Sequence, residues 1–279
     1  MQGGTAKGTL PVIVKDKVFV VTGAGDGIGR DVALTLVHKG ARVAAVDISE
    51  SGLRETAARV GGCERLSTHT IDVVDRSAVS ALPDVVAQTH GAVDGVVSVA
   101  GIIHKFARFD DLAFSDIERV INVNFYGVLN VTKAFLPVLL KRPEANITAV
   151  SSMGSFVSVP GQTVYGASKA AVKALMEGLD AELRDTDVRV SVVFPGAIAT
   201  NIAVNSGALT PEASAARAQS MRMTPSAVAA TKIVRGIEKG SRHIRVGWDS
   251  IMLDKLSRLA PAQTARLVHS RMRDLLSNS

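Results

Sequence analysis

The feature that most constrains the fold is a glycine-rich turn between a short apolar run and a helical stretch. Residues 17–21 form the apolar run, residues 22–29 have the sequence Thr-Gly-Ala-Gly-Asp-Gly-Ile-Gly, and residues 30–39 follow helical spacing. A strand that enters a helix through such a turn is typical of a dinucleotide site. Glycines let the backbone approach a pyrophosphate, and the helix N-terminus offers unpaired N–H groups. A plain tight turn is the alternative interpretation of the same residues.

An acidic residue stands where a ribose would be recognised. Residues 42–46 form a second apolar run, and Asp47 ends it eighteen residues after Gly29. A carboxylate at this place accepts hydrogen bonds from an adenosine ribose and would repel a 2′-phosphate, so Asp47 favours NAD over NADP. Neither of the next two residues, Ile48 and Ser49, is a cation that could bind such a phosphate. A helix N-cap is the alternative role for Asp47, but Ser49 fits that role better.

The alternation of apolar runs and helical stretches continues to residue 246. Strands are expected at 17–21, 42–46, 65–71, 93–99, 146–150, 188–194 and 243–246. The helices between them include one long helix over 117–140 and another over 163–184. This alternation predicts an α/β fold, a Rossmann-type, doubly wound parallel sheet of about seven strands with helices on both faces. We expect a single catalytic domain over 17–247 that contains a lid at 197–224, preceded by a flexible arm over 1–16.

Composition excludes several classes of protein. Apolar residues make up 47% of the 279 residues, and the one cysteine, Cys63, allows neither an internal disulfide nor a cysteine cluster for a metal. No apolar run is long enough to span a bilayer, and the first ten residues lack an apolar signal segment, so a cytoplasmic protein is expected. Residues 232–279 hold ten Lys or Arg against four Asp or Glu, which accounts for the whole net charge of +6. The charge therefore belongs to the tail and does not indicate nucleic-acid binding.

The segment 151–169 carries the residues best suited to chemistry. Tyr165 and Lys169 are four residues apart in a helical pattern, so their head groups can converge on one ligand. An ammonium near a phenol favours the phenolate and lowers its pKa, which helps Tyr165 to exchange a proton with an alcohol or ketone oxygen. Ser152 lies thirteen residues earlier at a strand end, where its hydroxyl could reach the same oxygen. Taken alone, a Tyr–Lys pair at this spacing is as readily a solvated helix face.

In their order and spacing, these motifs resemble the classical short-chain dehydrogenase/reductase family over residues 17–246. The resemblance rests on the turn at 22–29, Asp72, Ala100-Gly101, Asn124, Ser152, Tyr165, Lys169, Pro195-Gly196 and Thr200. It implies a catalytic tetrad of Asn124, Ser152, Tyr165 and Lys169. The dinucleotide-binding residues that it implies are Gly23, Asp26, Gly27, Ile28, Gly29, Asp47, Ile48, Asp72, Val73, Ala100, Gly101, Tyr165, Lys169, Pro195, Gly196, Ile198 and Thr200.

Two positions differ from the family pattern or leave it ambiguous. The family commonly has Asn-Asn-Ala-Gly after the fourth strand, whereas this chain has Val99 in place of the asparagine that usually braces the central sheet. Ser151 and Ser152 are adjacent, and side chains alternate across a strand, so only one of them can face Tyr165. The spacing to Tyr165 favours Ser152, and Ser151 is the alternative.

The resemblance implies reversible hydride transfer between a nicotinamide and a carbonyl or alcohol carbon. Tyr165 would exchange the proton, while Lys169 would lower the phenol pKa and bind the nicotinamide ribose. Ser152 would donate to the substrate oxygen, and Asn124 would position a water that relays protons. The segments expected around the nicotinamide carry few charges, which favours a lipophilic substrate such as a steroid, retinoid, terpenoid or long-chain alcohol. The expected pocket residues, with His104 in a loop or at the pocket rim, are Ile102, His104, Met153, Phe156, Val159 and Ile202.

Residues 248–279 extend beyond the usual family core. Apolar residues at helical spacing, with arginines between them, predict a pair of basic amphipathic helices around Pro261. Such an extension could cover the active site, form a subunit interface or lie on an anionic membrane. A homodimer or homotetramer is the habit of the family. The alternative to an enzyme is a non-catalytic NAD-binding regulator, although such a protein would not need both Tyr165 and Lys169.

Overall fold

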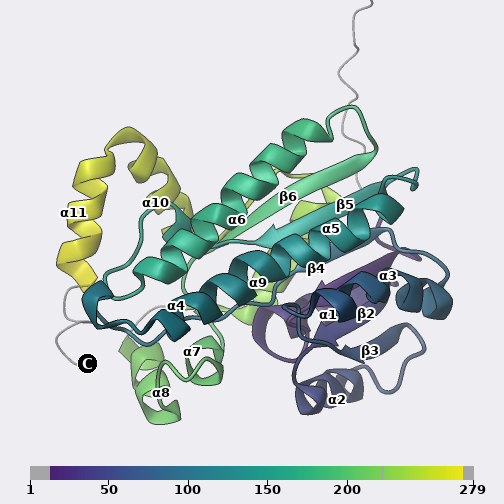
Figure 1. Ribbon diagram of the computed structural model, residues 1–279, viewed down its shortest axis with the longest axis horizontal. Helices are drawn as coiled ribbons and strands as arrows, with labels where there is room; N and C mark the ends of the chain where they lie inside the picture. The colour runs from purple at the N-terminus through teal and green to yellow at the C-terminus, as the bar shows by residue number, and fades with distance from the viewer. Residues whose placement is uncertain (1–12, 221–222, 273–279) are drawn as a thin grey trace, which may run out of the picture.

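Seven strands in the described part of the chain form one parallel sheet in the order β3-β2-β1-β4-β5-β6-β9 (Figure 1). The structure is a computed structural model and describes residues 13–220 and 223–272. The strands are β1 (Val18–Thr22), β2 (Arg42–Asp47), β3 (Leu66–Thr70), β4 (Gly95–Ser98), β5 (Ala145–Val150), β6 (Val188–Pro195) and β9 (His243–Val246). Each lies within two residues of its predicted bounds, so the predicted doubly wound sheet is confirmed.

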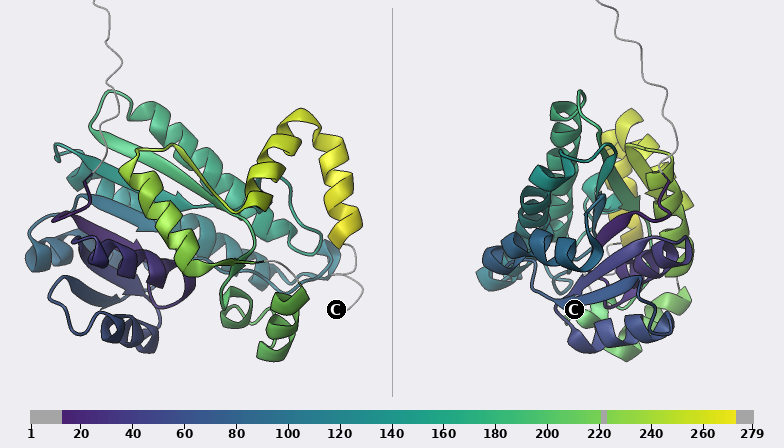
Figure 2. Two further views of the ribbon diagram at one scale, coloured as in Figure 1. Left: turned by 180° about the vertical axis from the view of Figure 1, so that it is seen from behind. Right: turned by 90° about the vertical axis from the view of Figure 1, so that its right-hand side faces the viewer.

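Helices cover both faces of this sheet, as the edge-on view in Figure 2 shows. The main helices are α1 (Gly27–His38), α2 (Glu50–Arg59), α3 (Arg76–His90), α4 (Phe114–Ile121), α5 (Gly127–Leu139), α6 (Thr163–Glu182) and α9 (Ser226–Glu238). Residues of α3, α5 and α6 pack with one face of the sheet into one hydrophobic cluster. Residues of α1, α2 and α9 pack with the other face into a second cluster. Because both faces are covered, the central strands β1, β4 and β5 are buried along their whole length.

The crevice expected at the centre of the sheet lies between the loops after β1 and β4. These strands are neighbours, and the chain proceeds from β1 to β2 on one side and from β4 to β5 on the other. Ligands bind at such a switch point, beyond the carboxyl ends of the strands. Thr22 Oγ1 accepts hydrogen bonds from Val99 N at 3.1 Å and Ala100 N at 3.3 Å. The Thr22 hydroxyl therefore connects the end of β1 to the loop after β4, at the place where the chain has Val99.

The predicted long helix over 117–140 differs from the structure in two ways. It begins earlier, at Phe114, and a π-helical turn, η2 (Asn122–Tyr126), separates α4 from α5. A π turn inserts an extra residue and changes the direction in which side chains point, and such turns are frequent at functional sites. Asn124 lies at its centre and is fully buried.

The expected lid and the C-terminal extension lie beyond the carboxyl edge of the sheet, towards the left of Figure 1. The expected lid contains the short pair β7 (Ile198–Ala199) and β8 (Thr224–Pro225), with helices α7 (Ile202–Asn205) and α8 (Pro211–Ser220) between them. The extension forms α10 (Trp248–Leu259) and α11 (Pro261–Met272). None of the helices in the described residues is long and apolar enough to cross a membrane.

The expected N-terminal arm overlaps the described residues only at 13–16. Val14 is buried there, and Asp16 N donates to Gly40 O at 2.9 Å, so this part of the arm packs on the domain. Residues 1–12, the rest of that arm, lie outside the described residues.

Candidate active site

Ser152 and Tyr165 meet at the carboxyl end of β5. Tyr165 lies in the first turn of α6, and Ser152 lies just after β5, before the 3-10 turn η3 (Met153–Ser155). The Ser152 hydroxyl accepts from Gly154 N at 3.0 Å and is hydrogen-bonded to the Tyr165 hydroxyl. Ser151 points the other way and donates to Lys169 O at 2.7 Å. Because side chains alternate across the strand end, Ser152 faces Tyr165 and Ser151 faces away from it, as the spacing to Tyr165 predicted.

Lys169 lies one turn after Tyr165 and is only 3% exposed. Its ammonium donates to Val150 O at 3.0 Å, and Nζ lies 6.0 Å from the centroid of the Tyr165 ring. Burial lowers the pKa of Lys169 to about 8. A Cβ atom at Gly101 would lie 3.1 Å from this ammonium and 3.2 Å from Asn124 Oδ1. Glycine at 101 therefore keeps the space over these two side chains open.

The pKa of Tyr165 does not follow the prediction. Burial raises it above its usual value, and the hydrogen bond with Ser152 offsets this rise only in part. The sequence predicted a lowered pKa for the Tyr165 phenol. That prediction is wrong, because this pKa is raised in the structure. The physical reason is desolvation: Lys169 is buried and Tyr165 is partly buried, which disfavours the phenolate as well as the ammonium. At neutral pH the Tyr165 phenol holds its proton.

Asn124 uses its amide to hold the loop after β4. Its Oδ1 accepts from Ile102 N at 2.8 Å, and its Nδ2 donates to Ile102 O at 3.0 Å and to Ser168 Oγ at 2.9 Å. The π turn thus places one side chain between this loop and α6. The observed contacts make Asn124 a brace for the loop, and the water-positioning role stays a prediction.

The glycine turn has the geometry of a phosphate cradle. Gly23 has φ +68°, and a Cβ atom there would lie 2.8 Å from Ala100 N. A Cβ atom at Gly29 would lie 2.0 Å from Gly23 O, so the turn closes only with glycine. Asp26 is the N-cap residue of α1 but makes no side-chain cap hydrogen bond. Backbone N–H groups in the first turn of a helix have no intrahelical partner, so this donor set fits a pyrophosphate.

Asp47 lies beside this turn. Its Oδ2 accepts from Gly25 N at 2.8 Å, and its Oδ1 accepts from Ser49 N at 2.8 Å. Ser49 is the N-cap of α2, with Oγ accepting from Gly52 N at 3.1 Å, so the alternative N-cap role does not fall to Asp47. The Asp47 carboxylate thus lies at the carboxyl end of β2, next to the glycine turn.

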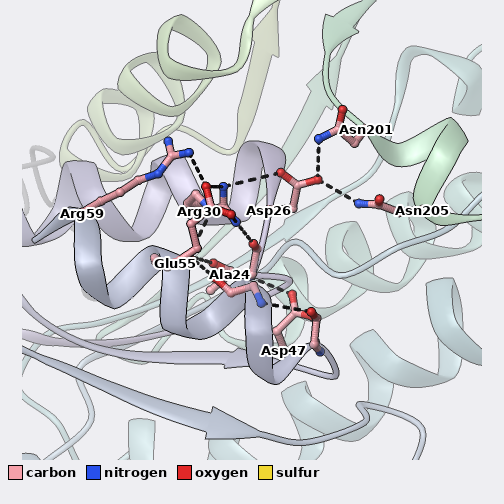
Figure 3. A network of polar contacts seen from close by, with 12 residues as sticks. Ala24, Asp26, Arg30, Asp47, Glu55, Arg59, Asn201 and Asn205 are labelled. Carbon is pink, nitrogen blue, oxygen red and sulfur yellow. Dashed lines mark hydrogen bonds and ion pairs between the residues drawn. The ribbon is translucent and has the colours of Figure 1, made fainter. Parts of the chain in front are cut away.

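Sequence reasoning missed Arg30, which follows the last glycine of the turn and is buried. Its guanidinium donates to Gly25 O, to Thr56 Oγ1 at 3.1 Å and to both carboxylate oxygens of Glu55 at 2.9 Å (Figure 3). These bonds hold the glycine turn against α2. A lone arginine after a glycine motif gives no sequence signal for such partners, because they lie 25 and 26 residues away.

The remaining expected dinucleotide residues follow the carboxyl edge of the sheet. Asp72 is exposed just after β3, and Val73 beside it is buried. Ile48 is 69% exposed after β2. At the other end, Gly196 N donates to Val246 O at 2.8 Å, and Ile198 lies in β7. The structure therefore arranges these predicted residues along one edge.

The expected pocket residues come from three segments: the loop after β4, η3 with the loop that follows it, and the start of α7. Met153, Phe156, Val159, Ile102 and Ile202 are all partly buried, and the Phe156 ring packs on Phe194 with centroids 4.7 Å apart. His104, expected in a loop or at the pocket rim, lies in the loop after β4, and its side chain is fully buried. Gln162 Nε2 donates to His104 O at 2.6 Å, which fixes the histidine backbone beneath the start of α6.

The extension contributes Asp249, which sequence reasoning also missed. Its Oδ2 accepts from Ala197 N at 2.6 Å, and a Cβ atom at Gly196 would lie 2.0 Å from its Oδ1. Ser250 Oγ donates to Phe194 O at 2.7 Å, and α10 packs against η3. The start of α10 therefore holds the segment after β6. Within the described residues, no group of three or more His, Cys, Asp or Glu side chains could hold a metal ion.

Comparison with known proteins gives the same family as the motifs. The chain matches the family model for short chain dehydrogenase over residues 17–209. It is 37% identical over 260 residues to SadH of Mycobacterium tuberculosis, a match that covers 90% of this chain and 94% of that protein. It is 32% identical over 198 residues to dehydrogenase/reductase SDR family member 7B of Mus musculus, covering 69% of this chain and 61% of that protein.

Solved structures have the same architecture. A short-chain dehydrogenase/reductase from Burkholderia phymatum in complex with NAD has a TM-score of 0.78 and 26% identity, with 95% of this chain and 97% of that chain covered. A short chain dehydrogenase from Burkholderia cenocepacia in complex with NADP shares the fold at a TM-score of 0.74 and 23% identity, with 94% and 99% covered.

Proposed function

The chain belongs to the short-chain dehydrogenase/reductase family of oxidoreductases, and from this premise we propose that it is an NAD(H)-dependent enzyme. It interconverts a secondary alcohol and a ketone, or a primary alcohol and an aldehyde. The observation that carries the proposal is the convergence of Ser152, Tyr165 and Lys169 beside Gly101, at the switch point of the sheet. A non-catalytic regulator would not require a buried lysine beside a partly buried phenol that is hydrogen-bonded to Ser152.

The protein groups supply proton transfer and orientation. The bound nicotinamide supplies the hydride donor or acceptor. Tyr165 holds its proton because burial raises its pKa, so its hydroxyl can donate to a carbonyl oxygen in the reductive direction. Ser152 donates to the same oxygen as negative charge develops there. Lys169, with a pKa of about 8, can carry a positive charge at neutral pH and stabilise the phenolate that the transfer leaves.

The preference for NAD is supported by the charges around the glycine turn. Asp47 places a carboxylate next to Gly25, where a 2′-phosphate would meet a negative charge. The Arg30 guanidinium, which contacts the glycine turn, is buried and already hydrogen-bonded to Glu55. The structures with NAD and with NADP show that this fold takes either dinucleotide, so the choice depends on these residues.

A lipophilic substrate is supported by the side chains around Tyr165. Met153, Phe156, Val159 and Ile202 bring apolar surface to this region. Pockets of this kind bind apolar bodies and use a few polar groups for orientation, here Ser152. A steroid, retinoid, terpenoid or long-chain alcohol combines such an apolar body with an oxygen that Ser152 could orient. We propose a homodimer or homotetramer as the working assembly, with the exposed Phe114 and Tyr126 of the α4–η2 face available for contact.

The test is a panel of alcohols and ketones from short polyols to sterols, followed by nicotinamide absorbance with NAD(H) and NADP(H) in parallel. Turnover that increases with the bulk and apolarity of the substrate, and that prefers NAD(H), is the expected result. A clear preference for NADP(H) would overturn the argument from Asp47. Dinucleotide binding without turnover of any member of the panel would favour the regulator.

A further inference from the structure

A polar contact joins the glycine turn to the lid across 175 residues of sequence. Asp26 Oδ2 accepts hydrogen bonds from Asn201 Nδ2 at 3.1 Å and from Asn205 Nδ2 at 2.8 Å (Figure 3). Thr200 lies next to this contact, since a Cβ atom at Gly27 would lie 3.2 Å from its Cγ2. We call the three side chains of Asp26, Asn201 and Asn205 the Asp26 clasp. It connects the loop before α1 directly to α7.

The other end of α7 is held on the opposite side of the site. Ser206 follows α7 and is buried; its Oγ accepts from Ile103 N at 3.1 Å. Its carbonyl oxygen accepts from Arg119 of α4 at 3.1 Å. The short helix therefore extends from the glycine turn after β1 to the loop after β4. These are the two loops that border the central crevice.

The chemistry of the clasp suits a contact that opens and closes. Burial acts to raise the pKa of Asp26, but hydrogen bonds from Asn205, Gly27 N and Asn201, together with nearby Arg30, outweigh it and hold the pKa below its usual value. The carboxylate is therefore ionised at neutral pH, which strengthens both amide bonds. The bonds are exposed to solvent, so water can replace them at a small net cost.

We propose that the Asp26 clasp is a gate for dinucleotide exchange. The inference rests on the proposed function, because a dinucleotide on the glycine turn would lie between that turn and the segment after β6 that leads into α7. The clasp consists only of protein atoms, so it forms whether or not a dinucleotide is bound. The Asp26 clasp therefore slows both the binding and the release of the dinucleotide. A contact made to the dinucleotide itself would slow its release only.

The test compares the rates of NADH binding and release by stopped-flow nicotinamide fluorescence in the wild type and in a variant with Asn201→Ala and Asn205→Ala. Both rate constants are expected to rise about threefold to tenfold, the range of net free energies of one or two exposed hydrogen bonds. The dissociation constant should change by less than about twofold, since both rates change together. Asp110→Asn, which removes an exposed carboxylate paired with Arg108, is the matched control and should leave both rates unchanged.

A polarity reversal separates the clasp from a general loosening of the lid. Asn205→Asp alone places a second carboxylate against Asp26, so it should open the clasp and raise both rates. Adding Asp26→Asn to that variant restores a donor and an acceptor with their roles exchanged, and should return both rates toward those of the wild type. Thermal unfolding of each variant shows whether the fold is retained.

The outcomes are distinguishable. Wild-type protein that binds neither NADH nor NADPH would overturn the proposed function and this inference with it. Wild-type protein that binds NADH, with variants whose rates match it, would overturn the gate alone. A faster release with an unchanged association rate would also overturn the gate, because it indicates a contact that stabilises only the bound state. If adding Asp26→Asn to Asn205→Asp does not slow NADH binding and release, the gate is also overturned. The faster rates would then come from a general loosening of the lid.

Discussion

Replacing Lys169 by methionine should make the protein more stable at neutral pH while it removes activity. The buried ammonium has a pKa of about 8, against an ordinary value of 10.5. A depression of this size corresponds to about 3 kcal/mol of unfolding free energy lost at neutral pH. Lys169→Met removes that cost but also leaves Val150 O without its 3.0 Å hydrogen bond, a loss of about 1 kcal/mol. The expected net gain at pH 7 is about 2 kcal/mol.

The pH dependence of this gain follows from the direction of the pKa shift. Between pH 8 and 10.5 the unfolded chain binds the Lys169 proton and the folded chain does not, so wild-type stability rises with pH in this window. The advantage of Lys169→Met is therefore complete below pH 8 and disappears as the pH approaches 10.5. At the upper end of the window the variant should be about 1 kcal/mol less stable than the wild type, because only the lost hydrogen bond remains.

The assay is urea unfolding of wild type and variant at pH 7 and pH 10, at one protomer concentration, since an oligomer unfolds in a concentration-dependent way. Lys173→Met, one turn further along α6 at a partly exposed site, is the control and should change stability by about 0.5 kcal/mol or less. A Lys169→Met variant less stable than the wild type at pH 7, or a stability difference equal at both pH values, would refute the argument from burial.

Three further predictions test other parts of the site. Asp47→Asn should raise the ratio of kcat/KM for NADP to that for NAD about tenfold, by removing a like charge from the 2′-phosphate, and an unchanged ratio would contradict this. Gly29→Ala should lower Tm and abolish NADH binding because its Cβ would overlap Gly23 O, whereas Gly178→Ala, with nothing within 4 Å, should leave both intact. Asp254→Asn should destabilise the protein by about 2 kcal/mol in urea, since this buried carboxylate pairs with two arginines; an unshifted midpoint would argue against it.

Most of the fold was predictable because the signals for its elements are local. Each buried parallel strand is a short apolar run, and each helix repeats apolar residues at its own period. The glycine turn, Asp47 and the Tyr165–Lys169 pair were found because short motifs define their local geometry. The choice between Ser151 and Ser152 also followed from alternation along one strand.

The parts that were missed depend on partners far away in the sequence. Asp249 lies 52 residues from Ala197, and Asn205 lies 179 residues from Asp26, so no local pattern indicates these contacts. The π turn was not predicted for the same reason. Asn124 at its centre makes side-chain hydrogen bonds to Ile102 and Ser168, which lie 22 and 44 residues away. The predicted direction of the Tyr165 pKa shift was wrong because burial, which sequence spacing does not report, outweighs the hydrogen bond with Ser152.

The most direct test of the central claim is the single-turnover rate of hydride transfer in wild type and Tyr165→Phe, measured at saturating NADH with a ketone that the panel identifies. The variant keeps the ring and removes only the proton donor. The account predicts a rate at least about a hundredfold lower, with a dissociation constant for NADH within about twofold of the wild type. A Tyr165→Phe rate equal to that of the wild type would show that the proton comes from another group and that the site is wrongly assigned.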